Sequence, residues 1–121
     1  MPRIAHFDIS SKEPEKTMEF FTKVFDWKFN NWGGPFEYWL ITTGPDNKPG
    51  INGGLSKGEP STAVVNTIDV ESLDDTIKMI EAHGGKITQP KGPIPGVGWY
   101  AAFQSPDGNA FGIMQDDPNA K

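Results

Sequence analysis

The chain has 121 residues, no cysteine and a formal net charge of −5. This length fits one ordinary domain, and the lack of cysteine excludes disulfides, thiolate metal sites and cysteine nucleophiles. The acidic balance disfavours nucleic acid and anionic membranes, because both select basic surfaces. The opening MPRIAHFDIS shows no signal peptide, and no apolar run is long enough to span a bilayer, so we expect a cytoplasmic protein without membrane contact.

The first half of the sequence predicts one helix among four strands. Residues 3–9 alternate between an apolar face and a mixed face that carries His6 and Asp8, which is typical of a strand. Ser10 or Ser11 can then cap a helix over residues 13–25. The expected apolar stripe of this helix is Met18, Phe21, Val24 and Phe25. Further strands are predicted over residues 27–32, 36–43 and 51–55.

Residues 56–61, SKGEPS, are the most linker-like segment, and the pattern restarts after them. Ser72 can cap a second helix over residues 73–82, whose stripe is Leu73, Ile77 and Ile80. Strands are predicted over residues 63–70, 86–88, 97–104 and 109–115. The Pro- and Gly-rich residues 90–96 predict a stiff loop, and residues 116–121 predict a frayed tail.

The order of elements is therefore β-α-β-β-β, given twice. We interpret the chain as one α+β domain over residues 1–121, with one repeat over about 3–55 and another over about 63–115. Neither half can bury both faces of its sheet alone. The helices cover one face, and the other must curve around a cavity or meet a partner.

Four segments strengthen this interpretation, namely AHFDIS…EKTMEFFTKVFDWKF (5–29), IEAHGGKI (80–87), PIPGVGWYAAF (93–103) and FQSPDGNAFGIMQ (103–115). In order and spacing they resemble the vicinal oxygen chelate superfamily, which includes glyoxalase I, bleomycin-resistance protein and extradiol dioxygenases. The resemblance covers nearly the whole chain. It implies that the tandem βαβββ modules form one curved, cup-shaped mixed sheet, and that two chains form a homodimer.

The resemblance also allows the family's metal ligands to be placed. Metal-dependent members take four ligands from four strands, and these positions map onto His6, Gly54, Val65 and Gly112. Only His6 can coordinate a metal, whereas a catalytic site normally needs three protein ligands. We therefore expect no metal and no other cofactor, although carboxylates such as Asp8 and Glu37 offer an alternative ligand set.

Without the family's ligands, Gly54 and Gly112 are expected to leave room for a small organic molecule. The residues predicted to bind it are His6, Asp8, Trp39, Asn52, Gly54, Trp99 and Gly112, with Tyr100 as a further wall. His6 is also the candidate general base. Structural roles stay open for each of them: core or dimer contacts for the aromatic rings, a turn for Asn52, and a purely structural hydrogen bond for His6. His83 is interpreted as a helix-terminal residue.

Three functions follow from these observations. The first is a metal-free binder of a small organic molecule, of the bleomycin-resistance type. The alternative is a metal-dependent lyase, isomerase or dioxygenase of the glyoxalase class with substituted ligands. The third is a structural or regulatory module, because a fold does not fix a function. Whether the chain is an enzyme stays open, and no motif names a substrate.

Overall fold

The structure is a computed structural model that describes residues 2–59 and 64–121. The chain divides into two compact units, which we call the first half (His6–Val64) and the second half (Val65–Lys121 with the chain's start up to Ala5). The predicted start of the second repeat at residue 63, and the predicted linker residues 60–61, lie outside the described residues.

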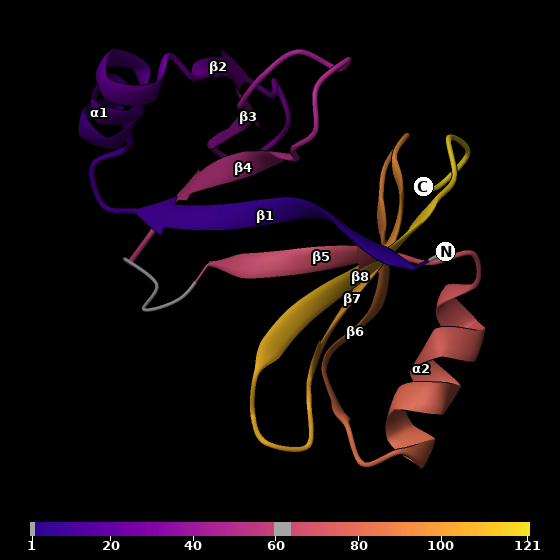
Figure 1. Ribbon diagram of the computed structural model, residues 1–121. Coiled ribbons are helices and arrows are strands. Elements are labelled where there is room, and N and C mark those ends of the chain that lie inside the picture. Colours follow the sequence, from indigo (N-terminus) through magenta and orange to yellow (C-terminus); the bar gives the residue numbers. More distant parts are fainter. Residues whose placement is uncertain (1, 60–63) are drawn as a thin grey trace. The chain divides into compact units, whose positions relative to one another are not determined.

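Each half shows the predicted order of one strand, one helix and three strands (Figure 1). The first set of elements is β1 (Arg3–Ser11), α1 (Pro14–Phe25), β2 (Lys28–Asn31), β3 (Tyr38–Thr42) and β4 (Asn52–Lys57). The second set is β5 (Val65–Asp69), α2 (Leu73–Ala82), β6 (Lys86–Ile94), β7 (Gly98–Gln104) and β8 (Ala110–Asp116). The predicted α+β class and its duplicated βαβββ order are confirmed.

The two halves also share one strand topology. The strands are ordered β2-β3-β4-β1 in the first half and β5-β8-β7-β6 in the second. In each half the first strand pairs in parallel with the last strand, and the remaining pairs are antiparallel. Each half is therefore a mixed sheet, and equivalent strands occupy equivalent places in the two halves.

The core of the first half lies on the α1 side of its sheet. Ile41 and Leu55 are almost fully buried there. Trp27 stacks on Phe21 of α1 with ring centroids 4.7 Å apart, and Phe7 of β1 contacts the same indole at 6.0 Å. Stacked aromatic pairs add about 0.5–1.5 kcal/mol beyond their buried area. These rings therefore attach the helix to the sheet.

The predicted stripe of α1 is only partly correct. Val24 and Phe25 are 56% and 55% exposed, so they do not join the core. The predicted serine cap is also wrong in detail, because the N-cap residue is Glu13 and it forms no side-chain cap. Ser11 instead accepts a hydrogen bond from the Glu13 amide and pairs with the Thr17 hydroxyl. The serine still supports the helix start, but from two residues before the N-cap position.

The core of the second half lies under α2 and agrees with the predicted stripe. Leu73, Ala101 and Ile113 are buried together, and Ile77 and Ile80 of the helix pack against them. The predicted cap is confirmed, since Ser72 Oγ accepts a hydrogen bond from the Asp75 amide at 3.2 Å. No helix in the described part of the chain is long and apolar enough to cross a membrane.

Two predictions for the second half are wrong. The stretch 90–96 was expected to be a loop, but β6 continues through Pro90 and Pro93 to Ile94, with two register shifts against β7. Proline is tolerated there because β6 is the last strand of its sheet, where an amide hydrogen is not needed on the open side.

The chain end is also more ordered than a frayed tail. Ala120 is buried, its carbonyl accepts the Gly96 amide, and the Asp117 amide donates to Val97. The segment is therefore packed against the β6–β7 turn, and Pro118 lies within this hydrogen-bonded stretch.

Candidate functional site

Three polar side chains of the first half meet on the sheet face opposite α1. The Tyr38 hydroxyl donates to Asp8 Oδ1 at 2.7 Å. His6 Nε2 lies 3.1 Å from the same hydroxyl oxygen and 3.4 Å from Asp8 Oδ1. We call this group the His6 cluster. About a third of the His6 and Asp8 side chains is accessible, at 32% and 34%, so the cluster can be reached from outside.

Strand register explains why these residues meet. His6 and Asp8 are two residues apart on β1, so they share a face. Asp8 is paired with Gly54 of β4, and Gly54 is paired with Leu40 of β3. Tyr38 stands two residues from Leu40 and therefore reaches diagonally across Gly54 towards Asp8. His6 and Asp8 share a face as the strand alternation predicts, whereas Tyr38 is not among the predicted site residues.

The space expected above Gly54 is filled by this tyrosine. A Cβ atom placed on Gly54 would lie only 1.6 Å from the Tyr38 hydroxyl oxygen and 2.1 Å from its Cζ atom. The glycine is therefore required by the ring, and it does not provide an empty volume.

The second half repeats this arrangement. A Cβ atom on Gly112 would lie 2.4 Å from the Tyr100 hydroxyl oxygen. Tyr100 stands two residues from Ala102, the β7 partner of Gly112, just as Tyr38 stands two residues from the partner of Gly54. The counterpart of Asp8 is Thr67, which pairs with Gly112. Thr67 is buried, and its hydroxyl has no hydrogen-bond partner among the described residues.

The structure brings some of the predicted site residues to other places. Trp39 is paired with buried Leu55 on the α1 side of its sheet, so it does not join the His6 cluster. Trp99 packs against the core under α2, on the face opposite Gly112. Asn52 shares the His6 face by register, but its Oδ1 accepts from the Thr43 amide at 2.9 Å.

Aromatic rings do adjoin the His6 cluster, although the sequence analysis did not select them. Phe36 is 61% exposed, and its ring centroid lies 6.3 Å from that of Tyr38. Trp32 contacts both rings, at 5.1 Å from Phe36 and 6.0 Å from Tyr38. We call Trp32, Phe36 and Tyr38 the aromatic cluster. The signal in the sequence is the density of rings in residues 32–38, which flank the Gly33-Gly34-Pro35 turn.

The resemblance maps metal ligands onto His6, Gly54, Val65 and Gly112. The side chains at these positions do not fit a metal ion. The glycine positions offer no donor atom, and each is covered by a tyrosine ring. Within residues 2–59 and 64–121, no group of three or more His, Asp or Glu side chains is placed to hold a metal ion. Glu37, the other substitute ligand considered, is exposed and lies 4.0 Å from Lys57.

Trp99 has a polar partner in the C-terminal segment. Its Nε1–H donates to Asp117 Oδ2 at 3.0 Å, and the Asn119 amide donates to the other carboxylate oxygen at 2.9 Å. The indole hydrogen bond is the main cause that lowers the pKa of the Asp117 carboxyl, and the amide adds to it. Lys91 lies 5.0 Å above the same indole ring. These contacts give Trp99 a structural role.

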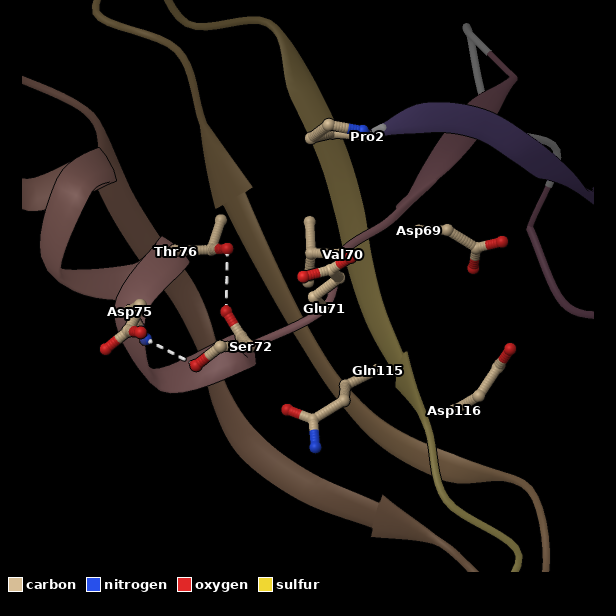
Figure 2. Close-up of a pocket in the computed structure, with 9 residues that line it drawn as sticks. All are labelled: Pro2, Asp69, Val70, Glu71, Ser72, Asp75, Thr76, Gln115 and Asp116. Carbon is tan, nitrogen blue, oxygen red and sulfur yellow. Dashed lines mark hydrogen bonds between the residues drawn. The ribbon is translucent and has the colours of Figure 1, made fainter.

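The second half also contains a pocket of about 660 Å³ at the start of α2 (Figure 2). It is lined by Pro2, Asp69, Val70, Glu71, Ser72, Asp75, Thr76, Gln115 and Asp116. The capping bond from the Asp75 amide to Ser72 lies in its wall. Four of its side chains are carboxylates, so its surface disfavours anions. It contains neither histidine, so this pocket and the His6 cluster are separate candidates. We favour the His6 cluster because it combines an imidazole, a phenol and a carboxylate within hydrogen-bonding distance.

Comparisons with known proteins agree with this fold. A sequence model of the Glyoxalase/Bleomycin resistance protein/Dioxygenase superfamily matches residues 3–113. The chain is 28% identical over 130 residues to the lactoylglutathione lyase GLX1 of Arabidopsis thaliana, covering 96% of this chain and 45% of that protein. The chain thus spans less than half the length of this curated relative.

Two solved structures show the same fold at low identity. The Mn(II)-bound glyoxalase from Novosphingobium aromaticivorans matches with a TM-score of 0.69 and 20% identity, over 98% of this chain and 38% of that chain. The methylmalonyl-CoA epimerase from Mycobacterium tuberculosis matches with a TM-score of 0.69 and 9% identity, over 95% and 88%. With the duplicated topology described above, the family match shows that the chain belongs to the glyoxalase/bleomycin resistance protein/dioxygenase superfamily.

Proposed function

We propose that this chain binds a small, planar organic molecule at the His6 cluster, without the metal of its glyoxalase relatives. The observation that carries the proposal is the Tyr38 ring over Gly54, with its hydroxyl on Asp8. The phenol of Tyr38 covers a glycine onto which the resemblance maps a metal ligand. His6 and Asp8 therefore remain as polar recognition groups, although the full set of metal-coordinating side chains is missing.

The chemistry next to the cluster favours an aromatic or similarly flat ligand. The exposed ring of Phe36 and the adjoining Trp32 offer stacking surface, and Leu40, 43% exposed, adds an apolar side chain on the same face as Gly54. Binding sites commonly combine such apolar walls with a few placed polar groups. His6 and Asp8 supply the polar groups.

The test is a thermal-shift screen of planar aromatic metabolites and antibiotics, followed by calorimetry on the compounds that raise the melting temperature. We expect His6→Ala to weaken binding by about tenfold or more, since hydrogen bonds to a partly buried polar group contribute about 1–2 kcal/mol. His83→Ala is the matched control, because it removes the other histidine, at the C-cap of α2, and should leave affinity unchanged. The proposal fails if nothing in the screen binds, or if both variants bind like the wild type.

A metal-dependent activity of the glyoxalase class is the second candidate. It is favoured by the proximity of His6 and Asp8 and by the likeness to a lactoylglutathione lyase over nearly the whole chain. Metal analysis after purification with added Ni²⁺, Zn²⁺, Fe²⁺ and Mn²⁺ separates the two. One equivalent of metal in the wild type that is lost in His6→Ala would support the second candidate against the first.

A further inference from the structure

The His6 cluster contains few protons, and their positions can be assigned. An ionised carboxylate only accepts hydrogen bonds, so the single hydroxyl proton of Tyr38 is directed to Asp8 Oδ1 at 2.7 Å. His6 Nε2 then faces two oxygen atoms, the Tyr38 hydroxyl at 3.1 Å and Asp8 Oδ1 at 3.4 Å. A bare nitrogen lone pair there would be repelled by both. Nε2 must therefore carry a proton.

We infer that Tyr38 and Asp8 select the Nε2–H tautomer of the His6 imidazole, and that Nδ1 is the atom that accepts a hydrogen bond from the ligand. This inference rests on the proposed function and assigns the ligand's chemical class. Nδ1 of His6 forms no hydrogen bond with any described residue, while about a third of the side chain is accessible. A neutral imidazole has one donor and one acceptor nitrogen, so the acceptor remains available.

The matching ligand carries an O–H or N–H donor on or beside a flat ring. Carboxylate ligands are disfavoured, because Asp8 already places negative charge within 3.4 Å of the imidazole and the chain has a net charge of −5. Tyr38 acts as a positioning residue in this arrangement, since it fixes which nitrogen of His6 carries the proton.

The second histidine, His83, is an internal reference, because its proton lies on the other ring nitrogen. His83 Nδ1 lies 2.9 Å from the Met79 carbonyl oxygen. A carbonyl only accepts, so Nδ1 of His83 must carry the proton. The chain has two histidines in all, and the structure assigns them opposite tautomers.

The experiment is a long-range ¹H–¹⁵N NMR correlation on the uniformly ¹⁵N-labelled full chain at about pH 8.5, above the ordinary histidine range. His83→Ala assigns the two ring patterns. We expect His6 to be protonated at Nε2 and His83 at Nδ1. In Asp8→Ala, which removes the acceptor of the Tyr38 proton, we expect His6 to show a mixture of both tautomers.

Phenol and anisole are the probes of ligand class, because they differ only in the hydroxyl proton. We expect phenol to shift the Nδ1 resonance of His6 and to bind roughly tenfold more tightly than anisole, the effect of about one hydrogen bond. A proton on Nδ1 of His6 would overturn the inference, as would an equal response to both probes or to neither. The proposed function fails by a different result, namely a screen in which no compound binds.

Discussion

At the residue scale, the main feature of this chain is a glycine, Gly54, whose open side is covered by the ring of Tyr38. The resemblance to the superfamily maps two metal-ligand positions onto Gly54 and Gly112, and glycine has no side-chain donor atom. It does not show what fills the space. That depends on the register between β3 and β4, which places Tyr38 two residues from the partner of Gly54. The register follows from the turn joining these strands, whose path no short motif in the sequence determines.

The contact between Tyr38 and Gly54 predicts that a methyl group added at Gly54 lowers the stability of the fold. Gly54→Ala should lower the free energy of unfolding by about 1–3 kcal/mol, the usual penalty of overpacking, because the added carbon would overlap the ring. The penalty should shrink in a Tyr38→Ala background. Urea unfolding of the wild type, Gly54→Ala, Tyr38→Ala and the double variant measures this coupling.

Gly44→Ala is a suitable control for that cycle. A Cβ atom at Gly44 meets no atom within 4 Å, so stability should change by less than about 0.5 kcal/mol. Equal penalties for Gly54→Ala with and without the Tyr38 ring would contradict the packing described here.

At the scale of elements, the sequence predicted a helix best where residues close together in the chain determine both its cap and its buried face. Ser72 is followed by the regular stripe Leu73, Ile77 and Ile80, and both the cap and the core of α2 follow from this pattern. No side chain caps the start of α1 in this way, because Glu13 is the N-cap residue and Ser11 instead accepts a hydrogen bond from its amide. The loop predicted over residues 90–96 is instead mostly strand, since prolines favour a loop unless the strand lies at an edge of its sheet.

The C-terminal segment is attached to β7 through a bond that depends on pH. The folded-state pKa of Asp117 is lowered by the Trp99 indole, so ionisation of this carboxylate contributes stability. The contribution is complete above the ordinary aspartate pKa of about 3.9 and is lost as the pH falls through the lower folded-state pKa. Asp117→Asn should therefore be less stable than the wild type at pH 7, and the two should converge in acid.

Tryptophan fluorescence during urea unfolding at a series of pH values measures this difference. Trp99→Phe removes the donor and should flatten the same part of the wild-type pH profile. A difference between Asp117→Asn and the wild type that persists unchanged at the lowest pH would show that the charge is not responsible.

At the scale of the whole molecule, the duplication was the most predictable property. Repeating β-α-β-β-β patterns can be recognised without any contact information, and the strand orders of the two halves are identical. The repeat also makes Tyr38 and Tyr100 counterparts, although their surroundings differ. Tyr38 meets Asp8, whereas the corresponding partner position next to Tyr100 is Thr67. The polar cluster with an imidazole therefore belongs to the first half.

We also propose that the chain forms a homodimer. Several large apolar side chains are more than half exposed, and burying them against a second copy would stabilise both chains. Outside the aromatic cluster, these are Phe20, Val24, Phe25, Val64 and Met79. Size-exclusion chromatography with light scattering should give twice the chain mass of 13.3 kDa. The mass of a single chain at every concentration would contradict this.

The prolines of β6 bear on how copies of this chain can associate. An exposed strand edge can recruit a strand of another molecule and so start uncontrolled polymerisation. β6 ends its sheet, but Pro90 and Pro93 have no amide hydrogen to offer, and its register shifts make the ladder irregular. The β6 edge is thus a poor template for the addition of strands from another molecule.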